Sequence, residues 1–519
     1  MKQFVITRLP LLVFLVAYVI FSVVTFKSYG ITWDEPRDYG RGDDFIEYSL
    51  GRSDIDISSQ NRYQGYLLYN SSYMAFNSFV TKYLFQAEDF AYRHLVNLLF
   101  ASLLFIVLYE ILLLASGSAM LSILGPLFLF VTPSFTGHIP GNPKDIPFAI
   151  LFLCGLYLIV VGSRIKNSSF RILLIGLVFG LAIAQRLLGV QLLVIYLLYS
   201  IYKTAVLHKK ISVHDIFRAI SDTSLVTVVA LFLLLVTWPF LAANPLQHGK
   251  DILLASSHYP WTGTLLHFGV NYKASAIPWF YLPGGFAVQV PLYITLLLGG
   301  GFMIIKRILK YEIVQVLLVT IVLNIAIYLV IAPVVYDTIR HYLFMIPLFV
   351  IISVLSLYEL VRALQTQVYR NRGSIQALFG ATFIVAIMVS FGLTAAQFIK
   401  LHPYQYVYHN ELVGYVQGAS GQFETDYWLA SYKEAAEWLQ QYVTLSDPNK
   451  KVTVYVSGSP YSAIAYLNKE RFTQVKSLED ADYLILTTRS RSPRATEDFE
   501  VVHNVGRGGA VFSEIYKRR

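Results

Sequence analysis

Long apolar runs recur between residues 10 and 398, and short polar segments separate them. A helix needs about 20 apolar residues to cross the hydrocarbon core of a bilayer. The runs that reach or approach this length are 10–29, 93–115, 119–136, 147–163, 171–186, 188–203, 223–242, 287–305, 313–332, 342–361 and 375–398. Residues 171–203 fit either two short spans that break near Arg186 and Gly189 or one long bent helix. The pattern predicts a polytopic α-helical membrane protein with about 11 transmembrane helices.

The distribution of Lys and Arg orients these spans, because cytoplasmic loops carry the excess of positive charge. If the N-terminus lies inside, the inner segments hold Lys2, Arg8, Arg164, Lys166, Arg171, Lys203, Lys209, Lys210, Arg218, Lys306, Arg307, Lys310, Arg362, Arg370 and Arg372. The short outer loops 137–146 and 333–341 hold only Lys144 and Arg340. Topology thus explains the net charge of +9, and we expect no nucleic-acid partner. We expect a multi-pass protein of the plasma (inner) membrane with a cytoplasmic N-terminus.

Two further outer segments, 30–92 and 243–286, are too long for simple connections. The stretch "RYQGYLLYNSSYMAFNSFVTKYLF" in the first is amphipathic, which predicts helices that lie along the membrane surface. The second is rich in His, Trp, Tyr, Pro and Gly.

Residues 399–519 have the pattern of a small α/β domain. Ser431 and Glu434 in "SYKEAAEWLQQYV" match a capping box at a helix start. "KVTVYVSG" and "ADYLILTT" predict strands with a helix "SPYSAIAYL" between them, and "FEVVHNVGRGGAVFSEIYK" predicts a hairpin. We expect a transmembrane domain at 1–398, with outer loops 30–92, 137–146, 243–286 and 333–341, and an extracytoplasmic α/β domain at 399–519.

Carboxylates stand at the start of the first outer loop and at the end of the second. Asp34 and Glu35 stand between Trp33 and Pro36 just beyond the first span, and Asp145 closes "HIPGNPKD" before the fourth. The structural reading is a solvated loop with Glu35 near a helix N-terminus and with Asp145 as a helix cap. Yet His138, Asn142 and Lys144 crowd the same short loop, which is dense polar chemistry for a connection at a membrane surface.

Lone cations lie at the outer ends of several spans, against the positive-inside trend. They are Arg93, Arg186 and Arg340, and His341 follows the last of them. Snorkelling to lipid headgroups explains any one of them. As a set that faces one site they would suit a phosphate, because the guanidinium fork matches phosphate geometry. His258, His267 and Trp261 in the long outer loop are weaker candidates.

The chain has no Walker, GxGxxG, GxSxG or HExxH sequence, which argues against a nucleotide-driven pump, a dinucleotide enzyme and a zincin. The first 200 residues resemble the GT-C glycosyltransferase superfamily, in the branch of protein O-mannosyltransferases and lipid A aminoarabinose transferases. The matching positions are the acidic pair Asp34-Glu35, Asp145 within "GNPKDIPF" and Arg93 at the second span, with "DTIRHYLFMIP" matching more loosely. The tail does not resemble the MIR domain of eukaryotic members.

The resemblance implies transfer of a sugar from a polyprenyl-phosphate carrier to a hydroxyl of a protein, lipid or glycan outside the cytoplasm. Asp34 or Glu35 would be the base, with Asp145 in the same site. The carrier phosphate would meet Arg340, Arg186, Lys144 and Arg93, and the substrate would contact His138, Asn142, His341 and Trp261. Some members use a divalent metal and others do not, and Asp34 and Asp145 are the carboxylates that could hold one.

Two other functions fit parts of the pattern. A secondary transporter or flippase would place charge pairs and broken helices within its spans, whereas these polar residues gather at outer span ends. A non-enzymatic receptor or assembly protein would leave Asp34, Glu35 and Asp145 without a common site.

Overall fold

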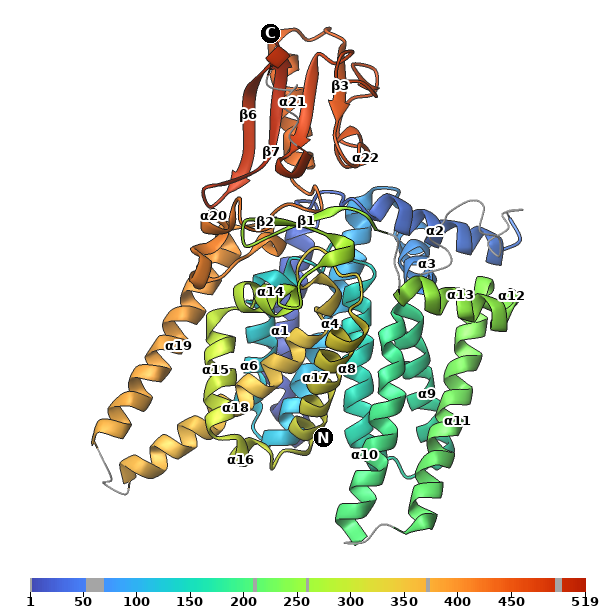
Figure 1. The fold of residues 1–519 in the computed structure, drawn as a ribbon, viewed down its shortest axis with the longest axis vertical. Coiled ribbons are helices and arrows are strands. Elements are labelled where there is room, and N and C mark those ends of the chain that lie inside the picture. Colours follow the sequence, from blue (N-terminus) through green and yellow to red (C-terminus); the bar gives the residue numbers. More distant parts are fainter. Residues whose placement is uncertain (1, 53–69, 209–211, 258–260, 370–373, 491–496) are drawn as a thin grey trace.

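The apolar runs fold into a helical bundle beneath a small sheet domain (Figure 1). The computed structural model describes residues 2–52, 70–208, 212–257, 261–369, 374–490 and 497–519. Nine helices in these ranges are long and apolar enough to span a membrane. They are α1 (Lys2–Thr25), α4 (Phe90–Ser116), α8 (Asp145–Val161), α9 (Ser168–Gln185), α10 (Gln191–His208), α11 (Val213–Thr237), α17 (Glu312–Ile331), α18 (Met345–Tyr369) and α19 (Ser374–Lys400). The expected polytopic fold with a C-terminal α/β domain is confirmed.

The expected count of about 11 spans is too high by this criterion, because proline interrupts two of the runs. Residues 119–136 form three short helices, α5 (Ala119–Ser122), α6 (Leu124–Phe130) and α7 (Pro133–Thr136), with Pro126 and Pro133 among them. Residues 287–305 fall on α14 (Tyr281–Gln289) and α15 (Leu292–Met303), which bend by 110° at Pro291. Counting this bent pair as one span gives up to 10 among the described residues.

Residues 171–203 form two separate helices. Arg186 ends α9 in an extended conformation, and a 3₁₀ turn, η3 (Leu187–Val190), leads into α10. This break leaves Arg186 at the end of α9 that faces the outer loops.

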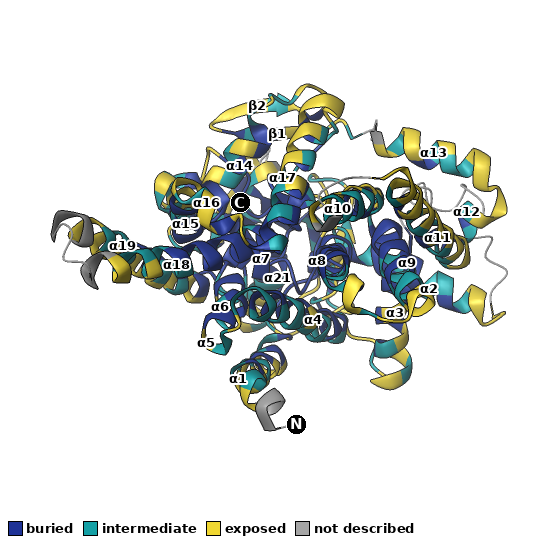
Figure 2. Cartoon of the chain, turned by 90° about the horizontal axis from the view of Figure 1, so that it is seen from below, coloured by how far each residue is buried: buried dark blue, intermediate teal, exposed yellow. Residues whose placement is uncertain are grey.

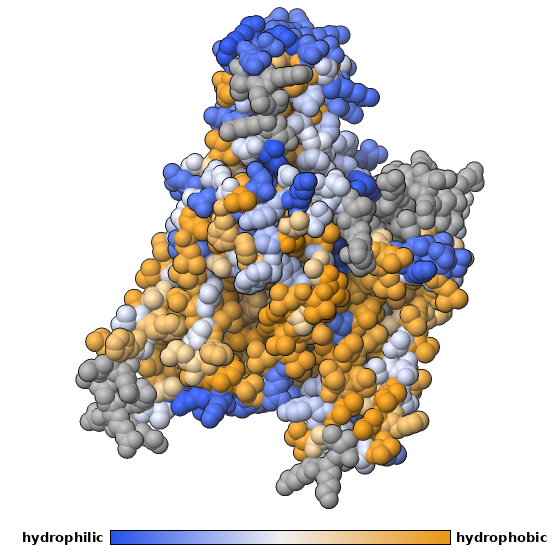
Figure 3. Space-filling model, in the orientation of Figure 1, coloured by the Kyte–Doolittle hydropathy of each residue, from blue (hydrophilic) through white to orange (hydrophobic). Residues whose placement is uncertain are grey.

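An apolar belt surrounds the bundle, with polar residues above and below it (Figure 3). Its members include side chains such as Val24, Val228 and Val330, which are exposed although they are apolar. Figure 2 shows the buried residues gathered in the middle of the bundle, around α7 and α8. Apolar side chains can stay exposed on this surface because the hydrocarbon core of a membrane contains no water.

The long outer segments lie at the upper end of the bundle (Figure 1). Residues 30–92 contribute α2 (Glu35–Ser49), α3 (Ser72–Phe79) and the π-helical turn η1 (Val80–Leu84). Residues 62–69 of the amphipathic stretch predicted there lie outside the described residues, as do His258, Lys209, Lys210, Arg370 and Arg372. Residues 243–286 contribute α13 (Pro245–Ser257), which follows α12 (Pro239–Ala243), and an antiparallel hairpin of β1 (Thr264–His267) and β2 (Val270–Lys273).

The C-terminal domain is a five-stranded mixed sheet in the order β4-β3-β5-β7-β6. The predicted strands and hairpin are present, and so is the helix of "SYKEAAEWLQQYV", while the predicted helix between the strands shortens to α22 (Tyr461–Ile464) and β4 (Phe472–Val475) was not predicted. The other elements are α21 (Tyr432–Ser446), β3 (Val452–Val456), β5 (Tyr483–Thr487), β6 (Phe499–Arg507) and β7 (Ala510–Arg518).

The predicted capping box at the start of α21 is wrong. The Ser431 side chain makes no capping hydrogen bond, and its hydroxyl donates to Asp426 instead. Glu434 accepts hydrogen bonds from Arg507 and from the Tyr404 hydroxyl, each at 2.7 Å. Tertiary partners therefore outcompete the local cap.

The segment that leads into the sheet domain packs directly on the outer loops. The Trp33 amide donates to the Trp428 carbonyl oxygen at 2.9 Å, and the Asn410 side chain donates to the Val290 carbonyl oxygen at 2.8 Å. Gly137 touches the backbone of Tyr406 so closely that a Cβ would overlap its nitrogen. The tail is thus fixed against the first two outer segments and against the bend between α14 and α15.

We expect Gly137→Ala to lower the free energy of unfolding by about 1–3 kcal/mol, because the methyl group must displace the Tyr406 backbone. The melting temperature of the purified protein measures this. Gly40→Ala is the matched control, since a Cβ there meets nothing within 4 Å, and we expect it to be neutral or slightly stabilising. Equal melting temperatures for the two variants would contradict the close packing.

Candidate functional site

The first outer loop begins with a helix that carries charges on one face. Pro36 stands in the first turn of α2, where proline is well tolerated, and Asp34 is the residue that precedes the helix. Asp38 follows Asp34 by four residues, and Arg41 follows Asp38 by three, so the three side chains share a face. Asp38 and Arg41 are buried and form an ion pair.

The second outer loop is held by Asn142. Its side-chain oxygen accepts hydrogen bonds from the amides of Lys144 (3.2 Å) and Asp145 (2.9 Å), and its amide group donates to Asp145 Oδ2 at 2.9 Å. This turn starts α8 and aims Lys144 at the first loop. Lys144 Nζ lies 3.0 Å from Asp34 Oδ2 and 2.9 Å from Asp38 Oδ2.

Arg340 connects the last outer loop to the first and second outer loops. Its buried guanidinium donates to Asp34 Oδ2 at 2.6 Å and to Asp337 Oδ2 at 2.9 Å, and Arg340 Nε lies 3.4 Å from Asp145 Oδ2. Arg186 adds a hydrogen bond from Nε to Asp145 Oδ1 at 2.9 Å. Asp34 and Asp145 therefore share the cation of Arg340. These two carboxylates come from different loops, and 110 residues separate Asp34 from Lys144 in the second loop.

Ion pairs join these residues into one ion-pair cluster. Within the described residues it contains six cations and five carboxylates, a surplus of one positive charge. Its members are Asp34, Arg37, Asp38, Arg41, Lys144, Asp145, Arg186, Asp337, Arg340, Glu424 and Arg489. The excess cation favours an anionic ligand.

The cluster shifts the pKa values of its loop residues. Burial alone would raise the pKa of Asp34, but the charges of Lys144 and Arg340 outweigh it and hold the pKa well below its ordinary value. Burial, with Arg186 nearby, lowers the pKa of His341 to about 3. Burial, with Arg340 nearby, does the same for His138. Near neutral pH the Asp34 carboxylate is thus ionised and both imidazoles are neutral.

Asp34 and Glu35 have different surroundings despite being adjacent. The Asp34 side chain is 18% exposed, whereas Glu35 is fully buried. Glu35 Oε2 accepts the Thr32 amide at 2.7 Å, and Glu35 Oε1 lies 2.9 Å from His94 Nε2. These bonds fix the turn before α2, so Glu35 is well placed to support the loop and poorly placed to meet a substrate.

Arg93 belongs to a different group of contacts. It donates to both oxygens of Asp43 at 3.0 Å and lies over the Tyr39 ring at 4.5 Å. It joins α4 to α2 beside the ion-pair cluster and shares no ion pair with the cluster's members. Arg93 matches the arginine that opens the second span in the GT-C resemblance. In the structure, however, it makes no ion pair with Asp34 or Asp145.

Aromatic rings line the same end of the bundle. Trp261 stacks on Tyr336 at 4.6 Å, and Tyr336 meets His341 edge-on at 4.6 Å. On the other side, His138 Nε2 lies 3.1 Å from the Tyr427 hydroxyl, and the Arg340 guanidinium lies 4.9 Å from the Trp428 ring centre. Rings of this kind suit a sugar, which presents apolar faces and hydroxyl edges.

Sequence reasoning missed several members of the site. Asp38 could have been found from its spacing of four residues from Asp34, and Asp337 from its place three residues before Arg340. Arg489, which lies 3.5 Å from Asp337 Oδ1, and the tail aromatics Tyr427 and Trp428 carry no local signal, because only the fold brings the tail to the loops.

Asp34 and Asp145 do not fit a shared metal ion in this arrangement. Arg340 occupies the position between them and contacts both carboxylates. Moreover, no group of three or more His, Cys, Asp or Glu side chains with metal-ligand geometry occurs in the ranges that the structure covers. The cations of the protein itself already supply the positive charge that a metal would bring.

An apolar groove runs from the site along α10 and α17. It has a volume of about 470 Å³ and reaches from Val194 and Leu323 up to Tyr336 and His341. A separate apolar pocket of about 540 Å³ lies farther along the same two helices, at Leu198 and Val319. The groove thus begins at a charged site and descends through the apolar belt.

The fold defines a polytopic membrane protein with a sheet domain over a charged site. No known protein family and no curated protein matches the sequence. In structure the chain is similar to ArnT from Cupriavidus metallidurans, with 10% identity and a TM-score of 0.49 over 97% of this chain and 97% of that one. It is also similar to the Archaeoglobus fulgidus oligosaccharyltransferase (13% identity, TM-score 0.38, 80% of this chain and 54% of that one).

A third similar structure is the arabinofuranosyltransferase AftD from Mycobacteria, with 13% identity and a TM-score of 0.43 over 98% of this chain and 40% of that one. At these identities the likeness concerns the course of the chain, and the role of each residue rests on the site itself.

We expect Glu35→Ala to lower the free energy of unfolding by about 1–3 kcal/mol, because it leaves the buried Thr32 amide without its acceptor. Asp34→Asn should lower the free energy of unfolding by less. Asp34 is partly exposed, and Lys144 and Arg340 still have other carboxylate partners. Melting temperatures of the two purified variants test this difference. The supporting role of Glu35 fails if Asp34→Asn is the more destabilising change.

Proposed function

We propose that the chain is an inner-membrane glycosyltransferase that moves a sugar from a polyprenyl-phosphate carrier to an acceptor hydroxyl. The reaction would take place on the non-cytoplasmic face, at the end of the bundle that carries the sheet domain. One observation carries the proposal: the ion-pair cluster, with its surplus cation, stands at the mouth of the apolar groove along α10 and α17. A polyprenyl phosphate has this combination of an anionic head and a long apolar tail.

The cations of the cluster suit the carrier phosphate. Arg340, Arg186 and Lys144 converge from three segments, and the groove ends at His341, the residue after Arg340. As the bond from the sugar to the phosphate breaks, negative charge grows on the bridging oxygen, and fixed cations stabilise that charge without reorganising. Arg93 would support α2 through Asp43 instead of contacting the carrier.

Asp34 is the base that the geometry favours. Its carboxylate is the most exposed of the three predicted acids, because Glu35 and Asp145 are buried. In the transfer, the acceptor oxygen forms a bond to the anomeric carbon, the carrier phosphate leaves with the electron pair of the old bond, and the hydroxyl proton passes to Asp34. A bound phosphate would share Lys144 and Arg340, which raises the pKa of Asp34 toward its ordinary value and makes it a stronger base.

The other predicted residues would act around this step. Asn142 holds Asp145 and is a positioning residue. His341 and Trp261, joined through Tyr336, would face the sugar at the groove mouth. His138 would keep Tyr427 and Trp428 in place near the acceptor. The acceptor is a hydroxyl of a protein, lipid or glycan.

A flippase is the second candidate, and the bend between α14 and α15 is the observation in its favour. However, the bend is packed by protein: Thr338 Oγ1 donates to Gln289 Oε1 at 2.5 Å, and Asn410 donates to the carbonyl oxygen of Val290. Transporters use such breaks to bind a substrate with freed backbone groups. Here Asn410 of the tail already donates to the carbonyl oxygens of Ala287, Val288 and Val290, and Ser134 of α7 donates to that of Gln289, which favours the enzyme. Asp34 and Asp145 share the cation of Arg340 and so belong to one site. This argues against a non-enzymatic receptor, in which the two carboxylates would have no common site.

We expect Asp34→Asn to reduce sugar transfer by about 10²–10⁴-fold, because the amide cannot take the acceptor proton. Transfer from a polyprenyl-phosphate sugar to surface glycan or protein, in membranes of a deletion strain that carries each variant, measures this. Asp44→Asn on the same helix is the matched control, since Asp44 is not a member of the ion-pair cluster. Full transfer by Asp34→Asn would overturn the assignment of the base.

We expect Val194→Trp or Leu323→Trp to raise the KM for a long-chain carrier several-fold and to leave the KM for a short-chain analogue nearly unchanged. Each indole would fill the groove, where only a long tail must pass. Leu231→Trp, on the lipid-facing side of α11, is the control and should change neither KM. An equal rise for both carriers would show that the groove does not hold the tail.

A further inference from the structure

A second polar cavity opens at the other end of the bundle. It encloses about 300 Å³ between α8, α9, α10 and α11. Asp145 begins α8 at the functional site, whereas Ile159 and the η2 turn (Gly162–Arg164) reach the cavity from the opposite end of that helix. The cavity shares no residue with the ion-pair cluster, so an inference about it stands apart from the proposed function.

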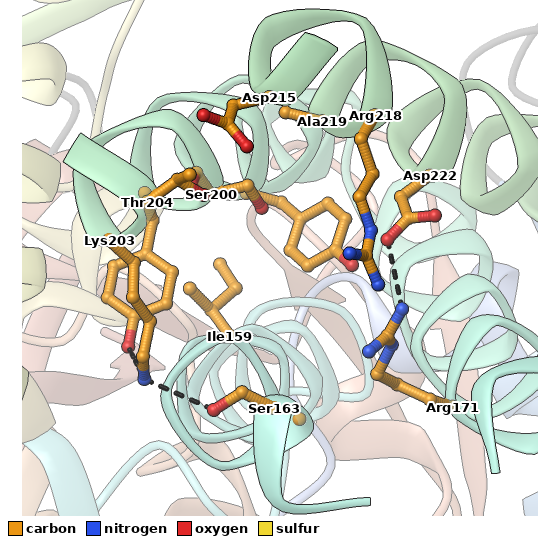
Figure 4. Close-up of a pocket in the computed structure, with 13 residues that line it drawn as sticks. Ile159, Ser163, Arg171, Ser200, Lys203, Thr204, Asp215, Arg218, Ala219 and Asp222 are labelled. Atoms are coloured by element: carbon orange, nitrogen blue, oxygen red, sulfur yellow. Dashed lines mark hydrogen bonds and ion pairs between the residues drawn. The ribbon is translucent and has the colours of Figure 1, made fainter. Parts of the chain in front are cut away.

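Charged and hydroxyl side chains from α9, α10, α11 and the η2 turn line the cavity (Figure 4). Arg171 on α9 donates to Asp222 on α11 at 2.9 Å. Lys203 on α10 donates to Ser163 at 3.1 Å and pairs with Glu312 at 2.9 Å. These pairs hold the walls together, and their charges compensate one another.

Arg218 is different, because it has no ion pair or hydrogen bond with any residue of the described ranges. Figure 4 shows its side chain extending from α11 toward the middle of the cavity, beside Asp222. The hydroxyls of Tyr196 and Ser200 line the same space and likewise have no hydrogen-bond partner among the described residues. Tyr196 and Ser200 stand four residues apart on one face of α10. The cavity therefore presents one guanidinium and two hydroxyl groups that make no ion pair or side-chain hydrogen bond with the described residues.

Exposed apolar side chains stand next to lining residues along the three longest walls of the cavity. Phe170 precedes Arg171 on α9, Val206 follows Thr204 by two residues on α10, and Phe217 and Ile220 flank Arg218 and Ala219 on α11. A soluble anion would gain nothing from these side chains, whereas an amphiphile would place its chains against them. Asp215, which lines one wall, can accept a hydrogen bond from a donor group of the ligand.

We propose that this cavity binds the phosphodiester headgroup of a membrane phospholipid in the leaflet opposite the ion-pair cluster. Arg218 and the hydroxyls of Tyr196 and Ser200 donate to the phosphate oxygens, and a hydroxyl or ammonium group of the headgroup donates to Asp215. The acyl chains lie on the exposed apolar side chains beside the cavity. Bound lipid then fills the polar space between α10 and α11.

The test uses the full chain, purified in detergent and stripped of lipid. Dioleoyl phosphatidylglycerol is the probe, and native mass spectrometry and the melting temperature report its binding. We expect retention of the lipid and a higher melting temperature, and we expect neither effect from dioleoylglycerol, which has the same chains without phosphate, or from inorganic phosphate. Arg218→Ala should weaken binding about tenfold or more, since a charge-assisted hydrogen bond is lost.

Arg307→Ala is the matched control, because Arg307 lies on α16 (Ile305–Ile308) and does not line the cavity. Ser200→Phe is a second variant that fills the cavity while Arg218 remains, and it should also abolish retention of the lipid. Equal affinity in wild type and Arg218→Ala would overturn the proposal. So would binding of dioleoylglycerol as tight as that of the phospholipid, or binding of inorganic phosphate alone, which would make this a site for a soluble anion.

Discussion

The buried guanidinium of Arg340 is the contact on which the outer face of this protein depends. A charge taken out of water costs several kcal/mol unless partners compensate it, and Arg340 finds them in Asp34, Asp145 and Asp337. These carboxylates come from the first, second and last outer loops. Because the buried guanidinium is compensated by all three carboxylates together, the three loops must meet in one arrangement. The same geometry places the carboxylates and cations around one point at the head of the groove.

The sheet domain completes this arrangement from above. Trp428 lies against the Arg340 guanidinium, Tyr427 reaches His138, and Arg489 pairs with Asp337 and Glu424. These contacts join the tail to the second outer loop at His138 and to the last outer loop at Asp337 and Arg340. The tail therefore forms part of the wall of the site and excludes water from it, which strengthens every charge interaction inside.

The bundle separates two kinds of chemistry along its axis. At the upper end, carboxylates and cations stand over an apolar groove that opens between α10 and α17 and is bordered by lipid-facing side chains. At the lower end, α10 turns Tyr196, Ser200 and Lys203 toward a polar cavity shared with α11. A ligand with a long apolar tail can reach the upper site sideways from the bilayer. This lateral route explains why the site lies at the membrane boundary and not at the tip of the sheet domain.

The sequence by itself determined the membrane class, most span positions, the tail strands, and the loops that hold Asp34 and Asp145, because hydropathy and strand periodicity are local properties. It did not separate Asp34 from Glu35, which differ only in what surrounds them, nor foresee that Arg93 turns to Asp43. Arg340 and Asp34 are 306 residues apart, and no local pattern records such a pairing. Only the tertiary structure decided which charges meet, since burial and long-range packing choose each partner.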